Sequence, residues 1–346
     1  MASEGGQKKS ALVTGAGGFV GRHMAERLVA EGYSVTVSDL RDPQIAGARF
    51  VKADITSRAA CEQITAGVAS VFHVASMVQT KQSGAAPVWA VNHGGTCNLL
   101  WAAQQAGVSR FVYVSSASVV YQGEDIENGD ESLPYTAVSQ APYADSKIAA
   151  ERDVIAANGK AGMLTCSLRP HVIFGPGDGR FLPAILRRAK AGALRLGVGT
   201  ENKLSDFTYI DNLIDALVLA DKKLATEDGA SLGGKVWFIT NGEPLPFWDF
   251  VDQVLVESGL PRIRARIPYR IAYAAATVAE KVHSLLGTGD GPENGFTRFA
   301  IRYLCTHHYF SIERARRDLG YSPAVSITEG IRRTVESLRQ SGDLPR

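Results

Sequence analysis

The chain has 346 residues, of which 45% are hydrophobic and 21% charged, and its 37 basic and 35 acidic residues leave a net charge of +2. This composition is typical of a soluble globular protein, and the length suits one large domain or a cofactor domain with a smaller substrate domain. A chain so nearly neutral gives no electrostatic case for binding nucleic acid, which needs a concentrated basic face.

The N-terminal residues Met1–Ser10 are polar, and no run of about 18 apolar residues occurs, so neither a secretory signal nor an ordinary membrane span is expected. The four cysteines lie far apart and form no CxxC pair, which argues against a zinc site or a disulfide framework. We therefore expect reduced thiols in a cytoplasmic protein, and no metal.

Short apolar runs rich in Val, Phe and Tyr alternate with helical patterns in the first 170 residues. This alternation predicts an α/β fold, a doubly wound parallel sheet with helices on both faces. The predicted strands are Ala11–Thr14, Ser34–Ser38, Arg49–Ala53, Ser70–Ala75, Arg110–Ser115 and Leu164–Leu168. The clearest helical patterns between them are Phe19–Ala30, Val88–Ala106 and Tyr143–Ala157.

After Pro170 the alternation ends and Gly and Pro become frequent. Further helices are predicted at Arg180–Ala191, Asp211–Leu224, Trp248–Gly259 and Ile327–Leu338, with a short strand at Lys235–Thr240. We predict a flexible N-terminus (1–9), a cofactor domain (10–170), and a region (171–340) that is mainly a smaller substrate-binding lobe interleaved with the last strands of the sheet.

Three glycines follow the first predicted strand at the spacing GxxGxxG: Gly15, Gly18 and Gly21. The first permits a tight turn, the second lets the backbone approach a pyrophosphate, and the third allows close helix–strand packing. The helix that begins at Phe19 and Val20 offers free N–H groups and a positive dipole end to phosphates. The pattern predicts a Rossmann-type dinucleotide site.

Asp39 ends the second predicted strand. A carboxylate there binds both hydroxyls of the adenosine ribose and repels a 2′-phosphate, which favours NAD over NADP. Arg41 could instead stack on adenine or accept a 2′-phosphate, so NADP stays open.

Two more strand ends are predicted to contact the cofactor. Asp54, with Ile55 beside it, could bond the adenine amino group, and its alternative role is a cap for the next helix. Val74 and Ala75 are small enough for the backbone to lie against the cofactor. The preceding His73 is predicted to be a packed, hydrogen-bonded histidine and not a catalytic one.

Tyr143 and Lys147 form a YxxxK pair at the start of a predicted helix, and residues four apart share a helical face. A free tyrosine has a pKa of about 10, and a neighbouring ammonium should lower it enough for proton transfer. Tyr143 then takes the proton of a substrate alcohol while a hydride leaves, and protonates the alkoxide in the reverse direction.

A third group should orient the substrate oxygen. Ser116, or alternatively Ser115, ends the fifth strand at the carboxyl edge of the sheet, where ligands bind. Asn92 lies in the helix after the fourth strand and either holds a water in a proton relay or bonds locally.

The segments TGAGGFVG, VNHGGT, YVSSASVVY, YADSK and RPHVIFGPGD together resemble the extended short-chain dehydrogenase/reductase superfamily. Within it the chain looks most similar to the 3β-hydroxysteroid dehydrogenase family, and especially to its sterol-4α-carboxylate 3-dehydrogenases (decarboxylating). The resemblance runs from Ser10 to about Leu338. It implies that Ser116, Tyr143 and Lys147 are a catalytic triad, and that Arg169, Pro170 and Ile173 lie near the nicotinamide.

The resemblance implies a sterol or steroid substrate: oxidation of a 3β-alcohol, with loss of the C4 carboxylate as carbon dioxide. A 3β-hydroxysteroid dehydrogenase without decarboxylation, a nucleotide-sugar epimerase or dehydratase, and a non-catalytic NAD-sensing regulator remain alternatives. Residues 268–286 carry an apolar stripe interrupted by charges. This segment is expected to line a sterol entrance or touch a membrane surface, or else to pack on the protein's own core. By family analogy we also expect a homodimer through helices near 88–106 and 143–157.

Overall fold

A computed structural model describes residues 9–78, 85–139, 141–192, 194–285 and 297–344. Its centre is a parallel sheet of seven strands in the order β12-β7-β5-β4-β1-β2-β3. The strand order reverses on either side of β1, and such a switch point opens a crevice at the carboxyl ends of the strands. The strands are β1 (Ser10–Thr14), β2 (Ser34–Asp39), β3 (Arg49–Lys52), β4 (Ser70–His73), β5 (Arg110–Val114), β7 (Leu164–Pro170) and β12 (Val236–Ile239).

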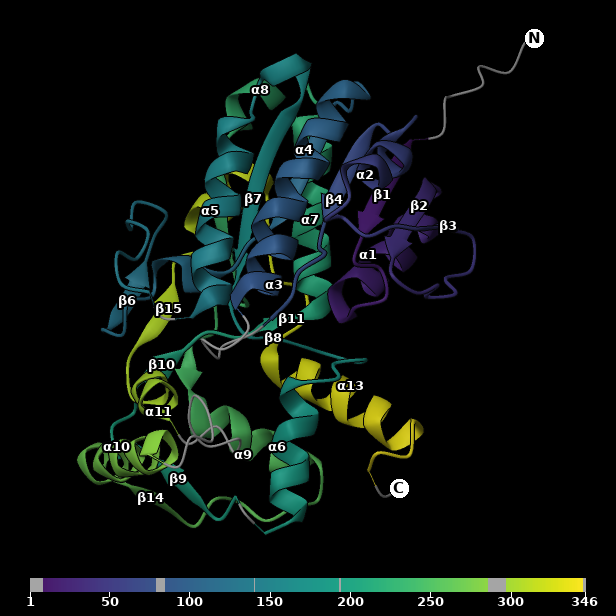
Figure 1. Cartoon of the computed structure of the whole chain (residues 1–346). Coiled ribbons are helices and arrows are strands. Elements are labelled where there is room, and N and C mark those ends of the chain that lie inside the picture. Colours follow the sequence, from purple (N-terminus) through teal and green to yellow (C-terminus); the bar gives the residue numbers. More distant parts are fainter. Residues whose placement is uncertain (1–8, 79–84, 140, 193, 286–296, 345–346) are drawn as a thin grey trace.

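Both faces of this sheet are covered by helices, as the predicted α/β fold requires (Figure 1). Successive residues of β1 point to opposite faces: Leu12 packs in the cluster with α2 (Arg58–Thr65), α4 (Thr96–Gln105) and α5 (Pro142–Ala156). Val13 packs in the cluster on the other face, with α1 (Phe19–Ala30) and α7 (Ile210–Leu224). The Rossmann-type doubly wound architecture is therefore confirmed.

The helix predicted at Val88–Ala106 consists of three pieces. It begins as α3 (Ala85–Trp89), passes through a π-helical stretch, η1 (Ala90–Gly95), and continues as α4. Hydrophobic periodicity does not reveal a π turn, which needs only one extra residue in the turn. The bounds of the strands differ from prediction by one or two residues, and the largest differences are at β4, which stops at His73, and β7, which continues to Pro170.

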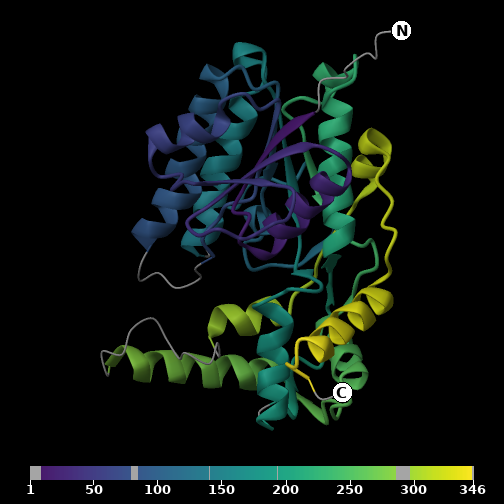
Figure 2. The same ribbon diagram turned by 90° about the vertical axis from the view of Figure 1, so that its right-hand side faces the viewer.

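A second lobe lies at the carboxyl ends of the strands (Figures 1 and 2). Its helices are α6 (Phe181–Lys190), α9 (Phe247–Glu257), α10 (Tyr269–Leu285), α11 (Arg298–Leu304) and α13 (Ile327–Gln340). Between them lie a four-stranded sheet, β13-β10-β15-β6, and the pairs β11–β8 and β14–β9. These strands are β6 (Ile126–Gly129), β8 (Ile173–Phe174), β9 (Leu196–Val198), β10 (Leu204–Ser205), β11 (Thr208–Tyr209), β13 (Leu245–Pro246), β14 (Ala265–Ile267) and β15 (His308–Phe310). The remaining short helices are η2 (Ala117–Val120), η3 (Lys160–Gly162), α8 (Gly229–Leu232) and α12 (Glu313–Leu319).

The chain crosses between the two lobes more than once. β12 joins the main sheet beside β7, and β6 pairs with β15 in the second sheet. The division at residue 170 stays a prediction. β6 precedes this residue in the chain but belongs to the second lobe, and β12 follows it but belongs to the main sheet. Within the described residues, no helix is both long and apolar enough to span a bilayer.

Candidate active site

The glycine loop is built for close approach. Gly15 has φ +69°, and a Cβ there would lie 2.6 Å from the Cα of Ala75. A Cβ on Gly21 would collide with the carbonyl oxygen of Gly15, so the start of α1 can pack on the loop only without a side chain. The steric roles expected for these two glycines match this geometry.

The start of α1 faces the end of β2. Gly18 is the N-cap of α1 and supplies no side-chain cap, so the first N–H groups of the helix remain available to an anion. The Asp39 carboxylate accepts hydrogen bonds from the backbone N–H of Gly17 (2.9 Å) and of Leu40 (2.7 Å). A carboxylate is thereby held beside the phosphate-binding turn, which fits the ribose of a dinucleotide.

The next strand end separates the roles of Asp54 and Ile55. Asp54 accepts hydrogen bonds from the backbone and the hydroxyl of Thr56 (2.9 and 2.8 Å), while Ser57 occupies the N-cap of α2. The alternative role of Asp54 as a helix cap is therefore wrong. The Ile55 side chain is buried against Gly95, so only its backbone is placed to meet a cofactor.

The end of β4 lies directly against the glycine loop. Thr14 Oγ1 accepts hydrogen bonds from the backbone N–H groups of Val74 (3.2 Å) and Ala75 (3.3 Å). His73 is fully buried between the hydroxyls of Thr14 and Thr96, at 2.8 and 2.9 Å. Burial, and secondarily the charge of Lys147, lowers the pKa of His73 to about 3, so this ring is neutral and packed, as predicted.

Tyr143 and Lys147 lie on the first turns of α5. The Lys147 ammonium is buried, donates to the carbonyl of Val114 (2.7 Å) and lies 4.6 Å from the centre of the Tyr113 ring. Burial lowers the pKa of Lys147 to about 7, although the charge of Glu151 opposes the change. Burial therefore makes this lysine a weaker base than an exposed one.

Ser116 is the serine that reaches Tyr143. Its hydroxyl is hydrogen-bonded to the Tyr143 phenol and accepts from Ser118 Oγ at 2.9 Å. Ser115 is buried on the other side, beside the Glu151 carboxylate. Of the two serines left open by the sequence, Ser116 is the one placed to orient a substrate oxygen.

The pKa of Tyr143 differs from the sequence-based expectation. Burial raises it, while the hydrogen bond from Ser116 and the charge of Arg180 lower it. We expected Lys147 to provide the lowering, but its ammonium points to the Val114 carbonyl and burial weakens its charge. The cation that lowers the pKa of the phenol is Arg180, which motif reading missed because it stands two residues beyond the RPHVIFGPGD segment.

Behind the triad lies a buried ion pair. Arg169, only 3% exposed, donates to the Glu151 carboxylate at 2.6 Å, and Ser167 donates to the same group at 2.7 Å. The neighbours Pro170 and Ile173 end β7 and open β8, at the carboxyl edge of the sheet. Arg169 therefore supports α5 through Glu151.

The Asn92 side chain is fully engaged. Its amide contacts the backbone N–H (2.7 Å) and carbonyl (2.9 Å) of Met77, the hydroxyl of Ser146 (3.0 Å) and that of Ser76 (3.3 Å). These four contacts use the full hydrogen-bonding capacity of an amide. The local-bonding alternative is therefore favoured, and Asn92 links η1 to α5.

The geometry agrees with the comparisons. The profile of the 3-beta hydroxysteroid dehydrogenase/isomerase family matches residues 12–269. The chain belongs to this family. It is 36% identical to the human "Sterol-4-alpha-carboxylate 3-dehydrogenase, decarboxylating", over 96% of this chain and 89% of the relative. It is 40% identical to the "2-alkyl-3-oxoalkanoate reductase" of Stenotrophomonas maltophilia, over 93% and 97%.

Among solved structures, the UDP-glucose 4-epimerase of Thermotoga maritima has a TM-score of 0.75 at 21% identity, over 96% of this chain and 99% of the epimerase. At that identity the likeness shows the fold. Because the chain belongs to the 3-beta hydroxysteroid dehydrogenase/isomerase family, it is an NAD(P)-dependent oxidoreductase that acts on CH–OH groups.

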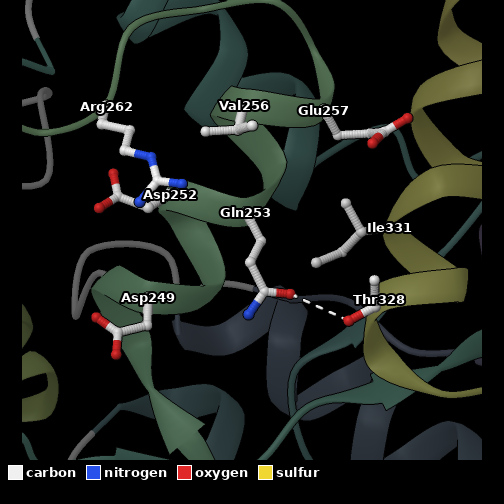
Figure 3. A pocket seen from close by; sticks show the side chains of 8 residues that line it. All are labelled: Asp249, Asp252, Gln253, Val256, Glu257, Arg262, Thr328 and Ile331. Carbon is white, nitrogen blue, oxygen red and sulfur yellow. Dashed lines mark hydrogen bonds between the residues drawn. The ribbon is translucent and has the colours of Figure 1, made fainter.

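Another pocket of this 3-beta hydroxysteroid dehydrogenase family member lies far from the triad in the chain, between α9 and α13 (Figure 3). Its carboxylates are already engaged: Asp249 pairs with Arg266 at 2.7 Å, and Asp252 accepts from the backbone of Ile263 at 2.9 Å. This polar lining does not suit a sterol, and none of its residues belongs to the predicted site.

The apolar stripe of α10 faces outward. Ile271 is 62% exposed, Val278 62% and Val282 47%, whereas the buried side of the helix carries Ala272 and Ala276. The helix packs on the protein's own core through Ala272 and Ala276, as one alternative held, while the apolar stripe of this family member lies on the outer face.

Proposed function

We propose that this enzyme oxidises an alcohol whose carbon is β to a carboxylate, and that its substrate is a 3β-hydroxysterol 4α-carboxylate that loses carbon dioxide. The name of the human relative places a carboxylate at C4 beside the reacting C3. The name of the bacterial reductase places an oxo group at C3 of a 2-alkylated alkanoate. Both names describe a reacting carbon separated from a carboxylate by one substituted carbon.

Arg180 is the observation that carries this proposal. The Asp178 carboxylate fixes the start of α6 by accepting from the backbone N–H groups of Arg180 (2.8 Å), Phe181 (3.0 Å) and Leu182 (2.8 Å). Among the described residues the Arg180 guanidinium has no hydrogen-bonded or ion-paired partner, yet its charge reaches the Tyr143 phenol. A guanidinium that acts electrostatically on the phenol and has no partner of its own is suited to binding a substrate carboxylate.

The glycine loop, the first turn of α1 and Asp39 would hold a dinucleotide, and we infer a preference for NAD from the Asp39 carboxylate. When bound, the nicotinamide supplies the hydride acceptor. Ser116 donates a hydrogen bond to the substrate oxygen, and Tyr143 takes the proton of the alcohol. The charge of Arg180 helps to stabilise the phenolate, and the buried ammonium of Lys147 would hold the cofactor ribose.

The product of oxidation is a β-keto acid, which can lose carbon dioxide on the same residues. The electron pair of the bond between C4 and the carboxylate moves toward the C3 carbonyl and forms an enolate. The hydroxyls of Ser116 and Tyr143 hold the developing oxyanion, and C4 then takes a proton. Decarboxylation therefore needs no further catalytic group.

The decisive experiment measures NADH formation with three compounds: a 4α-carboxy-3β-hydroxysterol, the same sterol without the carboxylate, and a 2-alkyl-3-hydroxyalkanoate. We expect the carboxysterol to turn over with release of one carbon dioxide. Turnover of the 2-alkyl-3-hydroxyalkanoate alone would show that the substrate is an acyclic hydroxy acid and not a sterol. Equal turnover of both sterols would contradict the carboxylate requirement.

Arg180→Gln tests the carboxylate contact. Because a hydrogen bond to a charged group contributes about 1.5–3 kcal/mol, we expect KM for the carboxylated substrate to rise about tenfold or more. The matched control is Arg187→Gln on the exposed side of the same helix, which should leave KM unchanged. An equal rise in KM for the uncarboxylated sterol would remove Arg180 from substrate recognition.

We further infer a homodimer through the helices around 88–106 and 143–157, and contact of the exposed face of α10 with a lipid surface. Sedimentation that shows only monomer at micromolar concentration would remove the first. The second is tested below with vesicles.

A further inference from the structure

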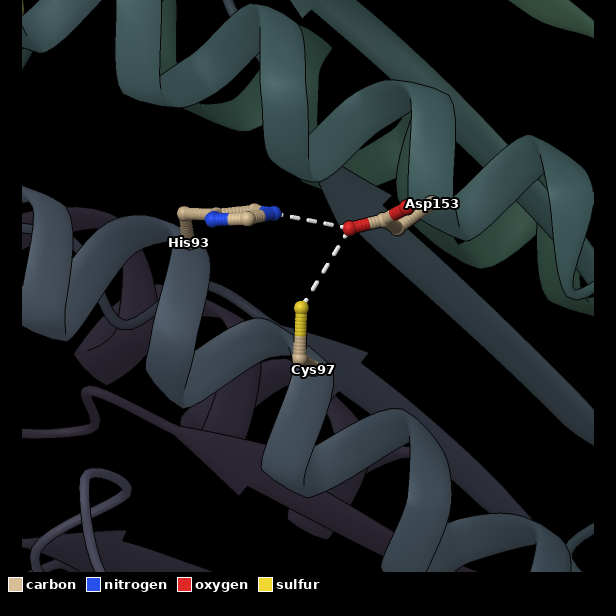
Figure 4. Close-up of side chains that lie close together, drawn as sticks. All are labelled: His93, Cys97 and Asp153. Carbon is tan, nitrogen blue, oxygen red and sulfur yellow. Dashed lines mark hydrogen bonds and ion pairs between the residues drawn. The ribbon is translucent and has the colours of Figure 1, made fainter.

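Three metal-ligating side chains meet on the outer surface of the helical layer formed by η1, α4 and α5 (Figure 4). His93 Nε2 lies 2.8 Å from Asp153 Oδ2, and Cys97 Sγ lies 3.3 Å from the same oxygen. Their ligand atoms lie within 4.8 Å of one another, and all three residues are partly exposed. None of them touches the catalytic triad or the predicted cofactor contacts.

We propose that His93 Nε2, Cys97 Sγ and Asp153 Oδ2 form a binding site for a divalent transition-metal ion of the zinc class. Zinc bonds to these donor atoms are about 2.0–2.3 Å long, which puts tetrahedral ligands about 3.3–3.8 Å apart. The separation of Cys97 Sγ from Asp153 Oδ2 lies at the lower end of this range, and that of His93 Nε2 from the same oxygen is about 0.5 Å shorter, so the ion needs a small outward movement of these side chains. As the ion binds, the thiol proton is lost to solvent, and the neutral imidazole keeps its single ring proton on Nδ1, which leaves the Nε2 lone pair for the metal.

The donor set selects the kind of metal. An imidazole and a thiolate favour zinc or cobalt over magnesium and calcium, which take oxygen ligands. His93 is held by the edge of the Trp89 ring, at 5.7 Å between ring centres and 89° between planes. In the single chain the Asp153 side chain is 47% exposed and that of His93 34%, so a water can complete the fourth position. In the homodimer inferred above, the same helices would face the second chain.

The site would join two helices that matter for catalysis. Asp153 is on α5, which carries Tyr143 and Lys147, while His93 and Cys97 are on η1 and α4. The only other link described above between η1 and α5 is the bond of Asn92 to Ser146 at 3.0 Å. A bound ion would therefore fix the position of α5 from its outer side.

The test uses the full-length protein after removal of metals with a chelator. We expect one zinc ion per chain by calorimetric titration, and with cobalt a thiolate-to-metal charge-transfer absorption. Cys97→Ser should abolish the absorption, and Asp153→Asn should weaken zinc binding at least tenfold. The matched control is Cys305→Ser, a buried thiol of the other lobe, which should keep both signals.

Two results would overturn the site: wild-type protein that takes up no stoichiometric zinc, or wild-type protein whose cobalt form lacks the charge-transfer absorption. Both of these measurements use wild-type protein, so the test does not depend on whether a variant folds. The three groups would then be an ion pair with a thiol hydrogen bond. Neither readout depends on the substrate, so failure here leaves the proposed function untouched.

Discussion

The triad region and the face of α10 violate the usual inside–outside distribution of residues in opposite ways. Around α5, Lys147, Glu151 and Arg169 are buried, although charged groups normally lie at the surface. On α10, Ile271 and Val278 are exposed, although such side chains normally form the core. We propose that buried charge at the first region serves proton transfer, and that exposed apolar surface at the second is available for contact.

The largest expected effect is the loss of activity in Tyr143→Phe. Removal of the phenol hydroxyl deletes the proton acceptor, so kcat should fall about 10²–10⁴-fold. The fold should persist because the ring remains. Tyr33→Phe, far from the triad in the sequence, is the matched control and should keep full activity. Activity of Tyr143→Phe within tenfold of wild type would refute the assigned role.

The next effect is on stability. Arg169→Met leaves the fully buried carboxylate of Glu151 without its guanidinium, which should lower the free energy of unfolding by about 3–5 kcal/mol. Glu26→Gln breaks an exposed pair with Arg22 and should cost about 1 kcal/mol or less. Urea titration measures both. Similar losses in the two variants would show that burial does not distinguish the pairs.

Acid should destabilise the fold through three buried histidines. Burial lowers the pKa of His73 to about 3 and that of His308 to about 4, and it lowers the pKa of His171 well below its ordinary value. Below a pH of about 6.5, these histidines therefore become protonated in the unfolded chain but stay neutral in the native state. Stability is full above that pH and falls as the pH drops toward 4.

Each such histidine contributes a slope of about 1.4 kcal/mol per pH unit. Urea titrations at several pH values between 7 and 4 measure it. The variant His171→Gln should reduce the slope, because its partner His308 at 2.8 Å remains the only titrating member of the pair. Constant stability from pH 7 to 5 would contradict the prediction.

The smallest effect on stability should come from Val278→Asp on α10. The side chain is exposed, so the free energy of unfolding should change by less than about 0.5 kcal/mol. Binding to anionic lipid vesicles should nevertheless fall about tenfold, because an inserted apolar side chain contributes about 1.5–3 kcal/mol. Val256→Asp, 48% exposed on α9, is the control and should keep vesicle binding. No vesicle binding by wild type would end the membrane proposal.

These regions also differ in how far the sequence predicts them. The glycine loop and the Tyr143–Lys147 pair are local patterns, so spacing along one turn or one helix was enough to find them. The choice of Ser116 over Ser115 depended on which side of the chain faces Tyr143, and only the structure decides it. Family resemblance supplied the substrate class, which no local pattern contains.

Contacts between residues far apart in the chain could not be predicted from the sequence. Arg180 and Tyr143 are brought together by the fold, as are His93 and Asp153, which are 60 residues apart. On α10 the periodicity correctly marked an apolar stripe, but it does not tell whether other parts of the chain cover that stripe. For the same reason, the cation that tunes the phenol was missed, and the exposure of the α10 stripe was only one of the alternatives.

The place of β12 has a consequence for how the chain is synthesised. β7 is complete at residue 170, but its neighbour on the outer side arrives only with Val236–Ile239. Until then the nascent sheet presents a row of unpaired N–H and C=O groups on a strand buried in the finished protein. The growing chain is therefore exposed to strand pairing with other chains during this interval. The N-terminal half cannot complete the seven-stranded sheet without a strand from the C-terminal half.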